Sequence, residues 1–290
     1  MYPDLSDLIK ELTVHTSKTL SISTKRPPEE TANALLSWER SEEFYDEMVF
    51  FLGPLKGKKL LEVGCGYALF LAICLKNSIR AEGVEPATQK FYKLTLKFGQ
   101  EILKRSGYSK NLIKNASGEK LPYKDNTFDV VVSFHTLEHV QNVQKVLAES
   151  TRVLKRGGYL YAVVPNYGSF WEGHYGIFWI PYLPKPLAKY YVRLWGKSPE
   201  ALSEYQFVNE LNLGKNIKNL PLEVHNWGKD LFVEKVKNLS IRGGTSLDFP
   251  MKVLRFLNSL KILRFAAILA SFFKAQTPII LVAQKIDPEY

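Results

Sequence analysis

With 290 residues, of which 46% are hydrophobic and 23% charged, the chain is long enough to bury one full-sized core, and its composition excludes general disorder. Two cysteines, Cys65 and Cys74, exclude a disulfide framework and favour a reducing compartment. The N-terminus carries no uninterrupted apolar run, so no secretory signal is predicted. We therefore expect a globular protein of the cytoplasm.

The formal net charge of +10 is unevenly distributed. No acidic residue lies between Asp248 and Asp287, and the aliphatic residues there alternate with cations. Such a stretch suits the anionic inner face of a membrane, contacted peripherally. The alternative is a partly buried helix whose cations face water. Nucleic acid is not expected, because the basic residues are not gathered among polar neighbours. The cations of this stretch are Lys252, Arg255, Lys261, Arg264, Lys274 and Lys285.

Residues 1–31 are polar and carry Arg26, Pro27 and Pro28 near their end, so we expect an N-terminal extension that is flexible. A helix is predicted over 32–52, and Gly53 and Pro54 end it. An alternation of strands and helices then begins, which is typical of a parallel sheet covered by helices on both faces. The predicted strands are 59–63, 81–85, 112–115, 128–134 and 159–164, and the predicted helices are 68–76, 88–104 and 143–154, the last ended by Gly157 and Gly158.

After Pro165 the alternation breaks, and residues 166–226 carry many aromatics and prolines. A regular pattern returns with a predicted helix over 229–238, a strand near 240–242 and a closing strand over 279–284. A helical stretch over 251–273 lies between those two strands. Charged residues interrupt it too often for a membrane span.

Two features at the start of the alternation indicate a nucleoside site. Gly64 and Gly66 follow the first strand directly and allow a sharp turn with close backbone approach to a ligand. Glu85 ends the second strand, about twenty residues later, where a carboxylate can accept hydrogen bonds from both ribose hydroxyls. A tight turn without a ligand and a solvated carboxylate are the structural alternatives.

The glycine turn favours S-adenosylmethionine over NAD. A dinucleotide site uses a third glycine, which is Ala68 here, and a helix terminus that receives a pyrophosphate. Glu62 within the strand would repel a pyrophosphate, but it suits a cofactor that carries an ammonium and a sulfonium group.

Five segments between about residues 58 and 165 resemble, in order, the motifs of the class I methyltransferases of the type 11 group. The resemblance implies S-adenosylmethionine as cofactor and a doubly wound α/β sheet of seven strands, mostly parallel, with the last strand antiparallel. The matching segments are Leu61–Gly66, Gly83–Pro86, Gly118–Val131, His135–Val140 and Leu154–Gly158.

The resemblance also assigns residues to the cofactor. It implies that the glycine turn holds the methionine portion, that Glu85 holds the ribose, that residues 117–119 lie beside adenine, and that the end of the fourth strand lies near the reactive methyl group. The expected cofactor-binding residues are Glu62, Gly64, Cys65, Gly66, Tyr67, Glu85, Pro86, Ser117, Gly118, Glu119, Phe134 and His135.

A hydroxyl acceptor usually has to lose a proton to a base. The candidate catalytic residues are His135, His139, His174 and Glu172, and a structural histidine is the alternative for each. We expect no metal. The alternative is a divalent ion at His135, Glu138 and His139, because these residues resemble a Glu-x-x-Glu-His element with which some methyltransferases bind an ion.

The chain is thus expected to comprise the extension 1–31, a cofactor-binding core over 32–165, an aromatic substrate lid over 166–226, and the end of the core sheet over 227–290 with a basic apolar helical insertion over 249–278. Aromatic platforms suit sugar rings, quinones or isoprenoid chains. The first expected activity is therefore O-methylation of a glycan or glycolipid precursor near a membrane. The alternatives are methylation of an isoprenoid quinone or lipid, a lid that is merely a packed subdomain, and a catalytically silent interaction protein.

Overall fold

The computed structural model describes residues 2–19, 27–87, 94–240 and 248–287. Its centre is a seven-stranded sheet in the order β3-β2-β1-β4-β5-β9-β8. Only β9 opposes its neighbours, β5 and β8, while the four other pairs of the sheet are parallel. The predicted doubly wound sheet with an antiparallel last strand is confirmed. The strands are β1 (Lys59–Val63), β2 (Arg80–Val84), β3 (Ile113–Lys114), β4 (Phe128–Phe134), β5 (Leu154–Val164), β8 (Leu222–Asn226) and β9 (Ile279–Lys285).

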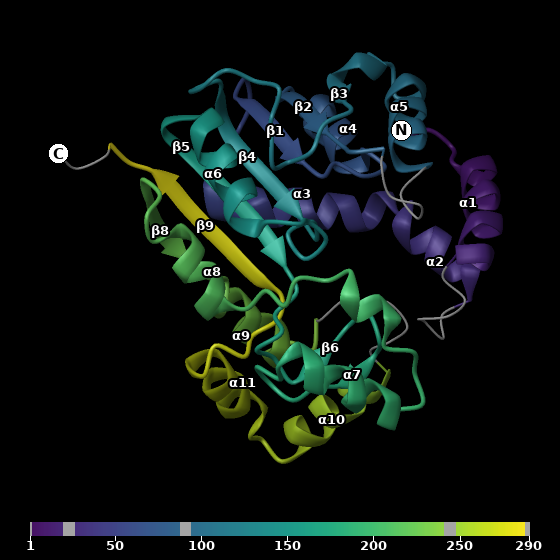
Figure 1. Ribbon diagram of the computed structural model, residues 1–290, viewed down its shortest axis with the longest axis vertical. Helices are drawn as coiled ribbons and strands as arrows, with labels where there is room; N and C mark the ends of the chain where they lie inside the picture. The colour runs from purple at the N-terminus through teal and green to yellow at the C-terminus, as the bar shows by residue number, and fades with distance from the viewer. Residues whose placement is uncertain (1, 20–26, 88–93, 241–247, 288–290) are drawn as a thin grey trace.

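Helices cover both faces of this sheet, as Figure 1 shows. Alternate residues of β1 point to opposite faces, so that Leu60 joins an apolar cluster with α3 and α4, whereas Leu61 joins one with α6 and α8. The described helices are α1 (Ser6–Thr19), α2 (Pro28–Leu35), α3 (Trp38–Leu52), α4 (Leu69–Lys76), α5 (Thr95–Arg105), α6 (Val143–Val153), α7 (Lys185–Leu194), α8 (Glu210–Ile217), α9 (Lys229–Lys237), α10 (Asp248–Ser259) and α11 (Leu263–Phe272).

The N-terminal segment, which we expected to be flexible, is packed against other helices. Leu8 and Leu12 of α1 are buried against Ala32 and Phe98, so the prediction is wrong for residues 2–19. The predicted helix over 32–52 is in fact two helices, α2 and α3. Ser37 separates them because its side chain accepts a hydrogen bond from the Arg40 amide and caps α3.

The sixth strand of the sheet is β8, which lies inside the predicted lid range 166–226. The strand predicted near 240–242 is not found at Ser240, and residues 241 and 242 lie outside the described residues. β8 is an edge strand that alternates half-buried and exposed residues, so its sequence carries little apolar signal. Gly157 does not cap α6. The helix ends at Val153, and Gly157 takes a φ of +71° within β5.

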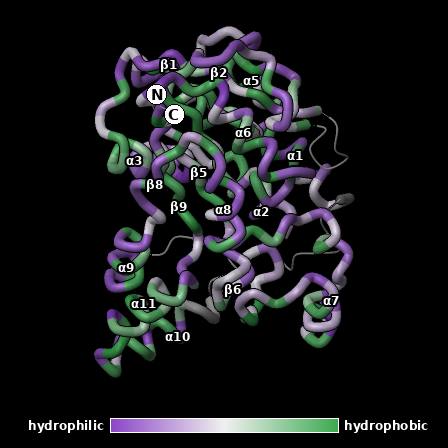
Figure 2. Tube along the Cα trace, turned by 60° about the vertical axis from the view of Figure 1, so that its left-hand side comes forward, coloured by the Kyte–Doolittle hydropathy of each residue, from purple (hydrophilic) through white to green (hydrophobic). Residues whose placement is uncertain are grey.

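The remaining elements lie together beyond one end of the sheet, the end to which β4 points (Figures 1 and 2). They are α10, α11, α7 and a short hairpin of β6 (Trp171–Glu172) and β7 (Ile177–Phe178). The Tyr182 hydroxyl joins the segment after β7 to the end of α11, because it donates to the Phe273 carbonyl at 3.2 Å. None of the described helices combines the length and apolarity that a membrane crossing requires.

Candidate functional site

The glycine turn after β1 forms the floor of the candidate site. Gly64 takes a φ of +75° and Gly66 a φ of +50°, both in the left-handed region that favours glycine. The Gly64 amide donates to the Val84 carbonyl at 2.9 Å, which fixes the turn to the end of β2. A Cβ atom on Gly64 would lie only 2.3 Å from Oγ1 of Thr136, so the turn after β4 also closes against it.

Glu62 brings a buried carboxylate to this turn. Its side chain is 4% exposed, and its Oε2 accepts no hydrogen bond from any described residue. Burial raises the pKa of Glu62 well above its usual value, and repulsion from Glu85 adds to the rise. A buried carboxylate without a donor is costly, so this position favours a cationic or hydrogen-bond-donating ligand.

Glu85 meets the glycine turn from the neighbouring strand. Its Oε2 accepts from the Gly66 amide at 2.9 Å, and its Oε1 accepts from the Thr95 hydroxyl at 3.0 Å. Each carboxylate oxygen has a further lone pair available to a ligand hydroxyl. Thr95, on α5, is not among the predicted site residues, because nothing in the sequence links it to the end of β2. Pro86 follows directly and is half-buried.

The other predicted cofactor residues lie on the same side of the sheet. Cys65 and Tyr67 are buried, and burial raises the pKa of the Cys65 thiol. The Glu119 carboxylate accepts from the Asn142 amide at 2.7 Å and so ties the loop 117–119 to the start of α6. Within this loop, the Ser117 hydroxyl accepts from the Glu119 amide, and a Cβ on Gly118 would lie 2.7 Å from Cγ1 of Val63.

The two predicted cofactor residues at the end of β4, Phe134 and His135, lie in different surroundings. The Phe134 ring packs into the core and stacks on Phe44 with 4.9 Å between ring centroids. His135 leaves the strand with a φ of +50°, and 34% of its side chain is exposed. Only the His135 ring therefore turns toward the catalytic candidates.

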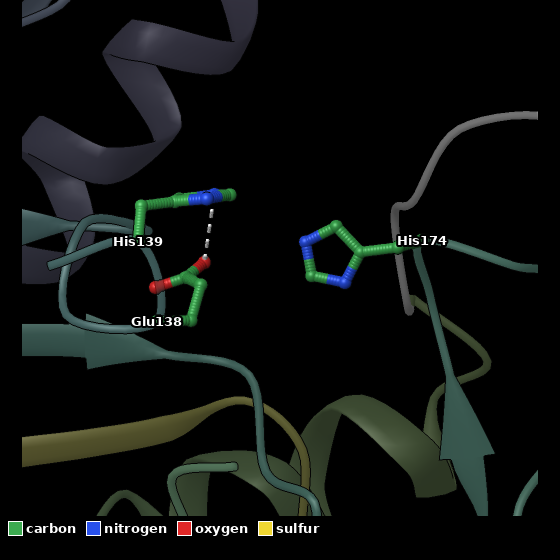
Figure 3. Close-up of side chains that lie close together, drawn as sticks. All are labelled: Glu138, His139 and His174. Atoms are coloured by element: carbon green, nitrogen blue, oxygen red, sulfur yellow. Dashed lines mark ion pairs between the residues drawn. The ribbon is translucent and has the colours of Figure 1, made fainter. Parts of the chain in front are cut away.

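All four catalytic candidates gather around Glu138, as Figure 3 shows for His139 and His174. Nδ1 of His135 lies 3.8 Å and Nε2 of His139 lies 3.9 Å from Oε1 of Glu138. His174 and Glu172 come from the β6–β7 hairpin, and Nδ1 of His174 lies 2.7 Å from Oε1 of Glu172. The sequence predicts these residues as catalytic candidates, but it does not show that the hairpin contacts the turn after β4.

The pKa values of neighbouring residues in this cluster are shifted in opposite directions. Burial lowers the pKa of His139, and the charge of His174 lowers it further. Burial also lowers the pKa of His174, but the Glu172 carboxylate more than offsets this and leaves that pKa above its usual value. Burial raises the pKa of Glu138 to about 7. Such a group of shifted residues is typical of a functional site.

The aromatic residues of the expected lid do not all face a ligand. Tyr167, Tyr175 and Trp179 are buried in a separate apolar cluster that α7 completes. These three stabilise the segment itself. Others remain exposed on its outer surface, namely Phe170, Phe178, Tyr182, Tyr190 and Trp195.

Comparison with known proteins identifies the family of this chain. The methyltransferase domain family matches residues 61–162. The demethylmenaquinone methyltransferase of Bacillus pumilus is 30% identical over 182 residues, which cover 61% of this chain and 73% of that protein. The enzyme of the same description from Geobacillus kaustophilus is 32% identical over 126 residues, 43% of this chain and 53% of its own.

The structure of geranyl diphosphate C-methyltransferase from Streptomyces coelicolor A3(2), with Mg²⁺, geranyl diphosphate and S-adenosyl-L-homocysteine, has the same fold. Its TM-score is 0.53 at 15% identity, and the match covers 90% of this chain and 84% of that one. The chain belongs to the class I S-adenosylmethionine-dependent methyltransferases of the type 11 group. Its cofactor is S-adenosylmethionine, and the buried Glu62 beside the glycine turn, whose Oε2 has no hydrogen-bond partner among the described residues, fits that cationic molecule.

We predict that Glu62→Gln stabilises the cofactor-free protein and weakens cofactor binding. The raised pKa of Glu62 makes the wild type lose stability as the pH rises from about 4.5 toward neutrality, because ionisation of the buried group opposes folding. The glutamine variant has no such loss, so its gain in melting temperature should grow with pH. Calorimetry should show roughly tenfold weaker binding of S-adenosylmethionine. A variant that is less stable than the wild type at pH 8 would contradict this account of Glu62.

Proposed function

We propose that this methyltransferase acts at a membrane surface on the head group of an isoprenoid quinone precursor. The observation that carries the proposal is the exposed apolar and basic surface formed by α10 and α11, which lie beyond the end of the sheet to which β4 points. The cofactor, when bound, supplies an electrophilic methyl group. The protein has to hold it, orient the acceptor and keep water away.

The proposed division of work follows the geometry. Glu62 would pair with the cofactor ammonium group, and the turn at Gly64 and Gly66 would let the methionine portion approach the backbone closely. Glu85 would accept from the ribose hydroxyls. The loop 117–119 would border the adenine, and Cys65, Tyr67, Pro86 and the end of β4 would complete the surroundings.

The acceptor's reacting atom would then lie near the cluster of His135, His139 and His174 around Glu138. The segment 166–205 would be the acceptor lid, since it carries His174 to the cluster. A quinol head group has acidic hydroxyls, and their ionisation makes the ring a nucleophile, so a site rich in imidazoles suits it.

The outer surface of the helices would contact the lipid. Phe256, Phe265 and Phe272 are 62%, 68% and 76% exposed, an unusual amount for so many large apolar side chains close together. Lys252, Arg255, Lys261 and Arg264 are exposed between them and suit anionic head groups. An isoprenoid chain buried in the bilayer would deliver its polar head at this surface.

The quinone class is favoured over the glycan class that the sequence first suggested. The relatives just described are demethylmenaquinone methyltransferases, and three aromatic residues that could have stacked on a sugar are buried instead. Activity on a glycolipid stays the competing outcome of the test.

Labelled cofactor and fractionated membrane lipids provide the test. We expect the labelled methyl group in the fraction that contains quinone precursors, and transfer to a synthetic precursor with a shortened isoprenoid tail. Label in the glycolipid or water-soluble fraction alone would overturn the proposal. Cofactor binding without transfer to any fraction would instead indicate a catalytically silent protein.

The membrane surface leads to a separate prediction. The triple variant Phe256→Ser, Phe265→Ser and Phe272→Ser should bind vesicles of phosphatidylglycerol and phosphatidylcholine at least tenfold more weakly, because each inserted ring contributes about 1 kcal/mol or more. Phe50→Ser is the matched control, since Phe50 is 73% exposed on α3 and should not matter. Flotation measures both variants. Equal flotation of the triple variant and the wild type would exclude this surface.

A further inference from the structure

Three potential metal ligands from two separate segments converge in the catalytic cluster. One donor atom each of Glu138, His139 and His174 lies within 4.8 Å of the other two. Glu138 and His139 follow β4, while His174 belongs to the turn between β6 and β7, 35 positions later in the chain. In Figure 3 a ring nitrogen of His174 points toward the other two side chains.

Glu138 is a buried carboxylate that lacks a hydrogen-bond partner among the described residues. Its side chain is 0% exposed, and neither carboxylate oxygen accepts a hydrogen bond from any described residue. The imidazole nitrogens of His135 and His139, at 3.8 and 3.9 Å, are too distant for hydrogen bonds. A buried carboxylate without a hydrogen-bond donor is costly, so this position suits a bound cation.

His174 is held as metal-binding histidines usually are. Its Nδ1 is bonded to the Glu172 carboxylate, and Glu172 also accepts from the Tyr175 amide at 2.6 Å. A ligating histidine typically donates its second ring nitrogen to a carboxylate, which fixes the tautomer and the ring plane. Tyr205 stacks on the His174 ring with 4.4 Å between centroids and so restricts it further. Nε2 is left to face Glu138 and His139.

We propose that Glu138, His139 and His174 bind one divalent transition-metal ion. Two imidazoles and one carboxylate favour Zn²⁺ or a similar first-row ion over Mg²⁺, which prefers oxygen ligands. Zinc-ligand bonds of about 2.0–2.2 Å require the donors to come closer than they now lie, so the ion would draw the hairpin toward the turn after β4. His135 is not among the three ligands, unlike in the alternative that the sequence suggested.

Three protein ligands leave at least one position open for the acceptor. This role rests on the proposed function: an acceptor hydroxyl would bind the ion, its O–H bond would break, and the proton would pass to water while the ion keeps its charge. The oxyanion that results would be held beside His135, near the end of β4. Metal binding itself does not depend on the identity of the acceptor.

Metal binding to the full chain, stripped with a chelator and without any acceptor, provides the test. Titration with Zn²⁺ should show one equivalent bound at micromolar affinity or tighter, and Mg²⁺ at the same concentration should not compete. Co²⁺ in its place should give visible absorption bands typical of mixed nitrogen and oxygen ligands. Zinc binding that is weaker than millimolar would overturn the proposal.

Variants identify the ligands. His174→Ala and Glu138→Gln should each lower zinc affinity at least tenfold and change the cobalt spectrum, and Glu172→Gln, a positioning variant, should weaken binding less. His135→Ala and the exposed His225→Ala should keep the wild-type affinity. Unchanged affinity in His174→Ala, or equal loss in His225→Ala, would overturn the proposal. Retained binding of S-adenosylmethionine shows that each variant is folded. If zinc binds as expected but no quinone precursor is methylated, the proposed function fails and the metal site stands.

Discussion

Replacing Glu85 by alanine is expected to weaken the binding of S-adenosylmethionine and S-adenosylhomocysteine about 100-fold or more. In the proposed complex, Glu85 accepts two hydrogen bonds from the ribose, and hydrogen bonds to a charged group contribute about 1.5–3 kcal/mol each. Their loss corresponds to roughly two orders of magnitude in the dissociation constant. Titration calorimetry with the demethylated product measures the effect without turnover.

The loss should have a second, smaller component. Glu85 also accepts from the Gly66 amide and the Thr95 hydroxyl, so alanine leaves both donors without this partner and loosens the turn. Circular dichroism and thermal unfolding separate this cost from the loss of ligand contacts.

Glu82→Ala is the matched control, because it removes the same charge from the same strand. The Glu82 side chain faces Lys59 and Lys114 at 3.4 and 3.7 Å, away from the glycine turn. Its removal should change cofactor affinity by less than about twofold, because its partly exposed ion pairs are not part of the glycine turn. Equal losses for Glu82→Ala and Glu85→Ala would remove Glu85 from the site and with it the proposed cofactor geometry.

The sequence predicts the first half of the sheet well for a physical reason. Strands buried on both faces, such as β4, form nearly continuous apolar runs rich in β-branched residues, and the glycine turn needs positive φ values that few residues other than glycine adopt. These requirements act on neighbouring residues. They are therefore visible in a short window of sequence.

The parts that were missed depend on contacts between distant residues. β8 is an edge strand with one solvated face, so five residues of weak alternation are all that marks it. Leu5, Leu8 and Leu12 do recur at helical spacing, but only Phe98 and the other residues of their cluster show what they pack against. The meeting of His139 and His174 depends on the path of the hairpin between β5 and α7, which no local pattern records.

Gly64→Ala should destabilise the protein by roughly 2–5 kcal/mol. A φ of +75° costs an alanine about 1–2 kcal/mol. The new Cβ would also lie 2.3 and 2.4 Å from Oγ1 and Cγ2 of Thr136, an overlap that forces the turn after β4 to move and costs about 1–3 kcal/mol more. The melting temperature should fall by about 3–8 °C.

Gly57→Ala isolates the two contributions, because Gly57 has a nearly identical φ of +76° but no atom within 4 Å of the added Cβ. It should show the backbone cost alone, about 1–2 kcal/mol. Adding Thr136→Ala to Gly64→Ala removes the two closest atoms and leaves Cβ of Thr136 at 2.9 Å, so part of the stability should return. Equal melting temperatures for Gly64→Ala and Gly57→Ala would mean that the turns after β1 and β4 do not press together. The cofactor turn would then lack the rigid support from Thr136 that this packing gives it.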